Sequence, residues 1–172
     1  FNPPRYMTLV ELIPTPSTDA KVLDDLEEFA TTALGKGVVR AKDTPNFVAN
    51  RIGVAGMMST MKEAERFGLT FDVVDDLTGK RLGRASSGTF RTADVVGLDT
   101  LAHVIKTMQD TLSEKTDPFY GSFVTPDVLK TLIEMGNLGQ KTKAGFFKKV
   151  GRDVMRFDLA SKDYVAAGQK AD

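Results

Sequence analysis

Residues 42–51 (KDTPNFVANR) constrain the fold of this 172-residue chain more than any other stretch. Pro45 fixes its own φ and disfavours the α region at Thr44, so the chain must turn there. Beyond the turn, apolar residues recur at every third or fourth position, which is the period of a helix with one buried face. They are Phe47, Val48, Ile52, Ala55, Met58, Met61 and Ala64. We therefore expect a strand end, a turn, and then a helix from Asn46 to about Phe67.

Asn50 lies near the N-terminus of this expected helix. Free backbone N–H groups and the helix dipole favour negative charge there. The side-chain amide of Asn50 can both donate to and accept from a bound group. The residue type by itself favours a plainer role, in which Asn50 only caps or decorates the first helical turn. This stretch alone leaves both roles open.

The composition argues against several classes of function. The 23 basic and 23 acidic residues cancel, so there is no electrostatic case for binding nucleic acid or a membrane surface. The absence of cysteine excludes disulfides and thiolate metal sites and suits a cytoplasmic protein. No apolar run approaches the roughly 18 residues of a membrane span. No Asp, Glu or Cys cluster accompanies the one histidine, His103, so we predict no metal site.

The pattern of the first part of the chain predicts a strand, a helix and a second strand. Residues 8–13 are nearly all apolar, as in a strand covered on both faces. Ser17 or Thr18 is placed to cap a helix over residues 19–34, and residues 37–41 read as a second strand. Two strands and one helix bury little surface, so we interpret this unit as the closing edge of a larger sheet.

The rest of the chain is mainly helical by pattern. After a basic loop at 79–88, the expected elements include a helix that Asp99 caps and a helix that begins at Thr125. The expected ranges are a helix at 72–78, helices from Asp99 to about Leu112 and from Thr125 to about Met135, and a hairpin of 146–150 with 154–157. The last dozen residues read as a solvated tail or a linker.

Three motifs occur in one order: FNPPRYMTLVELI at residues 1–13, the KDTPNFVANR run, and GQKTKAGFF at residues 139–147. Together they resemble the L-3-hydroxyacyl-CoA dehydrogenase family, in which a His-Phe-Phe-Asn-Pro motif leads into Leu-Val-Glu. Where the family pattern has glycine, this chain has Asn46 and Lys143. Asn tolerates positive φ better than most residues, so we expect the first of these turns to survive.

The resemblance implies a mainly α fold. A helical C-terminal domain, like that of 6-phosphogluconate dehydrogenase, would follow the last strand–helix–strand of a Rossmann-type dinucleotide-binding domain. We expect domain boundaries at 1–45, 46–150 and 151–172, the last being a hairpin strand with a tail or linker. On this interpretation the chain is a fragment. It lacks a Gly-x-Gly-x-x-Gly loop, and the family's catalytic histidine would stand two positions before Phe1.

The resemblance also implies an activity, the NAD-dependent oxidation of L-3-hydroxyacyl-CoA to 3-ketoacyl-CoA in fatty acid β-oxidation. Glu11 matches the carboxylate partner of the catalytic histidine, and Asn50 matches the active-site asparagine. Asn2 matches a residue beside the nicotinamide, and Lys141 matches a lysine that approaches the cofactor. NAD would be bound mainly by the missing N-terminal domain, so the fragment alone should be inactive.

The implied partners are an acyl-CoA substrate, a second copy bound through the helical domain, and a fused enoyl-CoA hydratase domain in the parent protein. A competing interpretation is a non-catalytic dimerisation or docking module of a multifunctional fatty-acid oxidation protein. A third is a dehydrogenase for short hydroxy acids with the same type of helical domain. Asn2, Glu11 and Asn50 together argue against that third interpretation.

Overall fold

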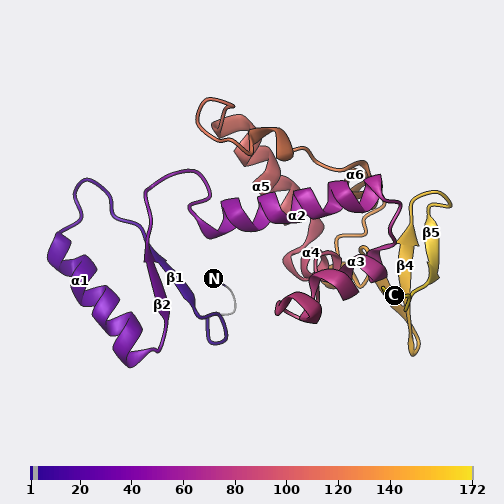
Figure 1. Cartoon of the computed structure of the whole chain (residues 1–172), viewed down its shortest axis with the longest axis horizontal. Coiled ribbons are helices and arrows are strands. Elements are labelled where there is room, and N and C mark those ends of the chain that lie inside the picture. The colour runs from indigo at the N-terminus through magenta and orange to yellow at the C-terminus, as the bar shows by residue number, and fades with distance from the viewer. Residues whose placement is uncertain (2–3, 172) are drawn as a thin grey trace. The chain divides into compact units, whose positions relative to one another are not determined.

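The structure, a computed structural model, describes residues 1 and 4–171. It divides into two compact units, Phe1–Ile52 and Gly53–Asp172 (Figure 1). The division falls inside helix α2, which spans Ala49–Arg66. The first turn of α2 therefore belongs to the first unit and the rest of the helix to the second.

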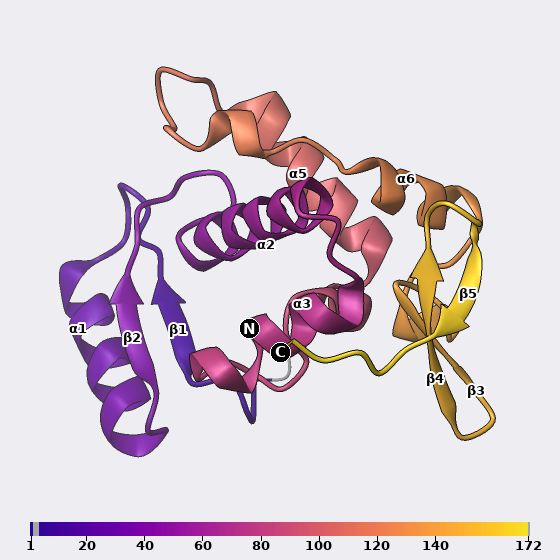
Figure 2. The ribbon, with the colours of Figure 1, turned by 45° about the vertical axis from the view of Figure 1, so that its right-hand side comes forward.

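The first unit has the predicted order of strand, helix and strand. Strand β1 (Leu9–Leu12) is followed by helix α1 (Ala20–Glu28), a π-helical turn η1 (Phe29–Ala33) and strand β2 (Gly37–Arg40). The two strands are parallel, and α1 runs beside β2 (Figures 1 and 2). The apolar residues of α1 and η1 are largely exposed, with Phe29 at 55%. Two strands and one helix do not cover them, as the sequence led us to expect.

The second unit is built from five helices and a small sheet. The helices are α2, α3 (Phe71–Thr78), α4 (Phe90–Val96), α5 (Leu98–Thr111) and α6 (Asp127–Glu134). Strands β3 (Phe147–Val150), β4 (Asp153–Asp158) and β5 (Asp163–Ala166) form an antiparallel sheet in that order (Figure 2). Short 3-10 turns lie at η2 (Lys80–Leu82), η3 (Tyr120–Ser122) and η4 (Gln140–Thr142). The mainly helical character predicted from the sequence is confirmed.

The core of the second unit is contiguous and rich in phenylalanine. The rings of Phe71, Phe90 and Phe146 lie with centroids 4.4–5.1 Å apart, in tilted and edge-on arrangements that favour aromatic attraction. Buried residues from α2, α4, α5 and α6 and from β4 complete the cluster. Because these rings come from α3, α4 and the segment before β3, they join parts of the unit that are far apart in sequence.

The structure corrects several sequence-based expectations about helix starts. Asp19 caps α1 by accepting a hydrogen bond from the Lys21 N–H at 2.8 Å, so neither Ser17 nor Thr18 is the cap. The cap positions of α5 and α6 are likewise Gly97 and Pro126 rather than Asp99 and Thr125.

The C-terminal residues also differ from the prediction of a solvated tail. Residues 163–166 pair with β4 as strand β5, and the N–H groups of Gly168 and Gln169 donate to Asp72 Oδ2 on α3. Backbone pairing and a buried carboxylate therefore hold this segment against the helical unit.

Candidate functional site

Glu11 lies near the end of β1 and is half-buried. Its Oε1 accepts hydrogen bonds from the backbone N–H groups of Ala49 at 2.7 Å and Val48 at 3.1 Å. These are unpaired amides at the start of α2, where the helix dipole stabilises negative charge. Among residues 1 and 4–171, no hydrogen bond is made to the other oxygen, Oε2. One oxygen of Glu11 is thus fixed, while the other remains available to a donor.

The turn after β2 makes this contact possible. Asn46 and Phe47 both have left-handed backbone conformations, with φ of 58° and 53°. The positive φ predicted at Asn46 is confirmed, and its neighbour shares it. This reversal brings the first amides of α2 to Glu11 at the carboxyl end of β1. Ligands of open parallel α/β sheets bind at this end of the strands.

Asn50 follows directly after Ala49 in the first turn of α2 and is exposed. The structure therefore brings Glu11 to the start of the helix that carries Asn50, within the same compact unit. No side-chain hydrogen bond of Asn50 is present among the described residues. Its amide is free to donate to and accept from a bound group.

The other two predicted site residues are placed differently. Asn2 lies outside the described residues. Lys141, in the second unit, places its Nζ 2.6 Å from both carboxylate oxygens of Asp99. This hydrogen bond with Lys141 lowers the pKa of Asp99. The role of Lys141 toward a cofactor stays a prediction.

Two buried aspartates hold the second unit together, and the sequence argument did not single them out. Asp75 on α3 accepts the backbone N–H groups of residues 89–91, which start α4. Asp94 on α4 accepts those of Phe146 at 2.8 Å and Phe147 at 2.9 Å. Burial raises the pKa of Asp75, and it raises the pKa of Asp94 to about 6. A sequence signal existed, because Asp75 lies one helical turn after Phe71 and Asp94 one turn after Phe90.

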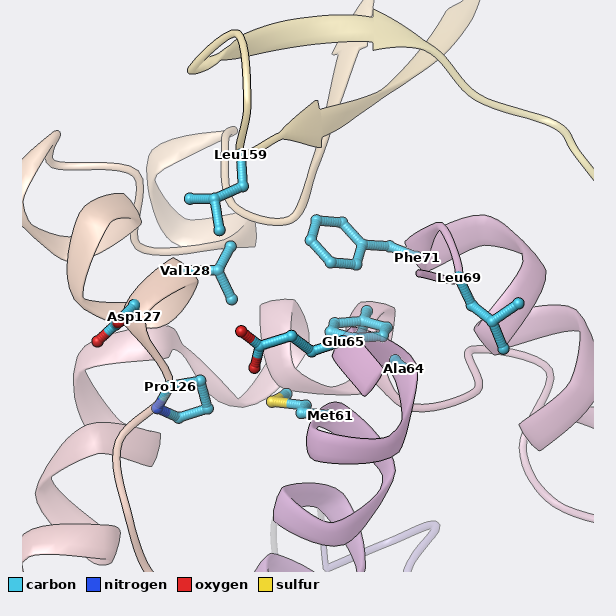
Figure 3. Close-up of a pocket in the computed structure, with 10 residues that line it drawn as sticks. Met61, Ala64, Glu65, Leu69, Phe71, Pro126, Asp127, Val128 and Leu159 are labelled. Atoms are coloured by element: carbon cyan, nitrogen blue, oxygen red, sulfur yellow. The ribbon is translucent and has the colours of Figure 1, made fainter. Parts of the chain in front are cut away.

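A small apolar cavity also lies in the second unit, among α2, α3, α4, α6 and Leu159 (Figure 3). Figure 3 shows Phe71, Val128 and Leu159 around the same space, with the carboxylate of Glu65 beside them. Its volume is about 130 Å³. Pockets for small molecules usually measure about 300–1,000 Å³, so this cavity is too small to be a complete substrate site.

Two further features bear on function. Over the described part of the chain, no group of three or more His, Asp or Glu side chains is arranged to hold a metal ion. Within the same residues, none of the helices has both the length and the apolar character needed to cross a membrane.

Known proteins match this chain along nearly its whole length. A family model described as the C-terminal domain of 3-hydroxyacyl-CoA dehydrogenase matches residues 47–149, and one described as its NAD binding domain matches residues 1–44. A probable 3-hydroxyacyl-CoA dehydrogenase from Deinococcus radiodurans is 50% identical over 156 residues, which are 91% of this chain and 44% of that protein. One of the same description from Bacillus subtilis is 43% identical over 164 residues, which are 95% of this chain and 20% of that protein.

A solved structure agrees with these matches. The crystal structure of FadB2 from Mycobacterium tuberculosis has a TM-score of 0.72 and 35% identity, and the match covers 87% of this chain and 50% of that one. The chain thus spans half or less of the length of each protein compared. Both parts of the family pattern are present in order, and the chain belongs to the 3-hydroxyacyl-CoA dehydrogenase family.

Proposed function

We propose that this chain contributes the carboxylate and the amide of the active site in an NAD-dependent 3-hydroxyacyl-CoA dehydrogenase. The substrate would be an L-3-hydroxyacyl-CoA, oxidised to the 3-ketoacyl-CoA in fatty acid β-oxidation. One observation carries the proposal: Glu11 is anchored through Oε1 to the start of α2, and Oε2 accepts no bond among the described residues.

This geometry suits a carboxylate that orients a histidine. To oxidise a secondary alcohol, a base must take the hydroxyl proton while hydride leaves the carbon. An imidazole can act as that base when a carboxylate fixes its tautomer and stabilises the imidazolium. In the proposed site, Oε2 of Glu11 accepts the N–H of this imidazole, which the family pattern places outside the described residues. The anchored Oε1 keeps the carboxylate from rotating.

Asn50 supplies the second function. Its exposed amide stands at the N-terminus of α2, where donors favour a developing negative charge. We propose that the Asn50 amide holds the substrate oxygen and the histidine in place as the hydroxyl becomes a carbonyl.

The residues of this chain fit part of an NAD site. They provide the carboxyl ends of two parallel strands, and residues 1–44 match the family's NAD binding domain. The sequence contains no Gly-x-Gly-x-x-Gly loop for the pyrophosphate. When bound, NAD accepts the hydride. We propose that Asn2 lies beside the nicotinamide and that Lys141 approaches the cofactor once it leaves Asp99.

Several partners follow from the same proposal. A homodimer through the helical unit is supported by exposed apolar side chains, Phe67 (64%), Leu69 and Leu77, around a hollow between α2 and α3. A multifunctional parent with a fused enoyl-CoA hydratase domain is supported by similarity to the putative fatty acid oxidation complex trifunctional enzymes of Rickettsia prowazekii and Rickettsia felis, which are 32% and 33% identical over 148 residues. The absence of cysteine supports a cytoplasmic location.

The test uses the full-length parent enzyme with 3-hydroxybutyryl-CoA as substrate. Glu11→Gln keeps an acceptor for the amides of Val48 and Ala49 but removes the charge, so kcat should fall about 10²- to 10⁴-fold while the fold persists. Asn50→Ala should also lower turnover by orders of magnitude. The matched control is Glu28→Gln, because Glu28 is exposed on α1 and its carboxylate forms no ion pair among the described residues.

The outcome also distinguishes the dehydrogenase from the competing interpretation of a non-catalytic docking module. Near-full activity of the Glu11 and Asn50 variants would remove both residues from the active site and favour a docking module. The purified 172-residue chain should give no turnover, because its one histidine, His103, is exposed on α5 and accompanied by no carboxylate cluster. Measurable turnover by the chain alone would contradict this assignment.

A further inference from the structure

A second hollow in the helical unit lies away from Glu11 and Asn50 along the chain. Its volume is about 700 Å³, within the range of small-molecule pockets. It is bounded by α4, the turn η4 and the β3–β4 hairpin. The lining residues are Arg91, Asp94, Gln140, Lys143, Phe147, Lys148, Lys149, Gly151 and Val154.

The lining is strongly basic. Arg91, Lys143, Lys148 and Lys149 come from three different elements and surround the same space. Among the described residues, the three lysines form no ion pair with a carboxylate. The chain as a whole has no net charge, so this excess is local. A concave surface with charges of one sign concentrates its field on a bound counter-ion.

The single acidic lining residue offsets only part of this positive charge. Both carboxylate oxygens of Asp94 are occupied by the N–H groups of Phe146 and Phe147. The side chain is also buried, at 5% exposure. Asp94 therefore forms no ion pair with the lysines, although its charge interacts with Arg91, and the lining keeps an excess of cations.

The backbone conformation at Lys143 bears on how this positive charge is placed. Lys143 has a φ of 62°, a left-handed conformation that L side chains rarely adopt and that glycine adopts freely. The corresponding position of the family motif is glycine. The left-handed conformation ends η4 at Lys143 and leaves a lysine, not a glycine, in the lining of the hollow.

Arg91 and Phe147 give the hollow a rigid wall. The Arg91 guanidinium lies 4.1 Å from the centre of the Phe147 ring, and its Nη1 is 3.6 Å from Asp75 Oδ2. A guanidinium held in this way keeps a planar set of donors that suits phosphate oxygens. The aromatic ring adds an apolar surface beside the charges.

We propose that this hollow binds a phosphate-bearing anion of nucleotide size. The cations come from three elements around one open hollow instead of following a strip, which fits a compact ligand better than an extended acidic peptide. The proposal does not depend on the dehydrogenase activity.

Isothermal titration calorimetry of the full chain tests this with ADP, pyrophosphate, adenosine and octaglutamate. We expect ADP to bind more tightly than pyrophosphate, adenosine to give no binding, and higher salt to weaken ADP binding. Lys143→Gly removes a charge and relieves the backbone, so the dissociation constant for ADP should rise about tenfold while thermal stability is kept or increased. Lys149→Gln should weaken ADP binding similarly.

The matched control is Lys115→Gln, an exposed lysine outside the hollow, which should leave ADP binding unchanged. Four results would overturn the proposal, three of which concern ADP and adenosine. They are no heat with ADP, equal binding of adenosine and ADP, or unchanged ADP affinity in Lys143→Gly. Tighter binding of octaglutamate than of ADP would also reject it and identify an acidic protein segment as the ligand.

Discussion

Asp94 makes the stability of the helical unit depend on pH in a direction opposite to that of most carboxylates. Burial is the largest influence on this side chain and raises its pKa to about 6, and the nearby charge of Asp75 raises it further. The two hydrogen bonds from Phe146 and Phe147 favour the ionised form but do not offset burial. The folded protein therefore binds a proton at Asp94 that the unfolded chain releases at pH 5.

The sign and size of the effect follow from this difference. The ordinary pKa is 3.8, below the folded value of about 6. Between these values the folded state holds more protons, so stability increases as the pH falls through the window. The full effect, reached below the unfolded pKa, is roughly 3 kcal/mol, and the gain from pH 7.5 to pH 4.5 is about 2 kcal/mol.

Urea unfolding followed by far-ultraviolet circular dichroism measures this gain at pH 7.5, 6.5, 5.5 and 4.5. The comparison protein is Asp94→Asn, which cannot titrate at this position. On acidification to pH 4.5, the wild type should gain about 2 kcal/mol relative to Asp94→Asn. Asp75, whose pKa is also raised by burial, is present in both proteins.

The other aspartates with shifted pKa values would not produce the same gain in stability on acidification. The pKa values of Asp72, Asp99 and Asp158 are lowered, so their contributions to stability are lost only as the pH falls below about 4. They are also present in both proteins. Parallel stability curves for wild type and Asp94→Asn, or a relative loss of wild-type stability on acidification, would refute the reasoning.

Two substitutions, one of them with a matched control, test the packing and the turn. Gly145→Ala would place a Cβ into Asp94 Oδ1 and 2.7 Å from the Gly139 Cα, so urea unfolding should show a loss of about 1–3 kcal/mol. Gly121→Ala, which meets nothing within 4 Å, should change stability by less than about 0.5 kcal/mol, and an equal loss in both variants would contradict the packing argument. Asn46→Gly relieves a φ of 58° and removes a buried Nδ2 that has no hydrogen-bond partner. Thermal unfolding should show a gain of about 1 kcal/mol, and a lower melting temperature would show that the Asn46 side chain stabilises the turn.

Local features of the sequence predicted much of the fold. Helix α2 ends at Arg66, one residue before the expected end at Phe67, because apolar spacing and Gly68 both act within a few residues. The β3–β4 hairpin and the left-handed turn at Asn46 were predicted for the same reason. The conformation of each of these segments is determined by its own residues.

Features that depend on distant contacts were not predicted. Helix α4 is seven residues long, and its start is fixed by Asp75, fourteen residues before Thr89. Strand β5 exists because β4 offers it an edge, and Asp72 holds the residues that follow it. Neither partner can be recognised from the sequence of the segment itself.

The carboxylates Glu11, Asp75 and Asp94 share one structural device, since each accepts two or more backbone N–H groups from a segment far away in the sequence. They differ in whether a carboxylate oxygen is left without a hydrogen bond. Asp75 and Asp94 are buried, and both oxygens of each accept hydrogen bonds from backbone N–H groups of the fold. Glu11 uses only Oε1 among the described residues and is half-buried. Its other oxygen, Oε2, lies at the carboxyl end of a parallel strand and is open to a further donor. This difference is why we propose Glu11, and neither Asp75 nor Asp94, as the carboxylate that orients the catalytic histidine.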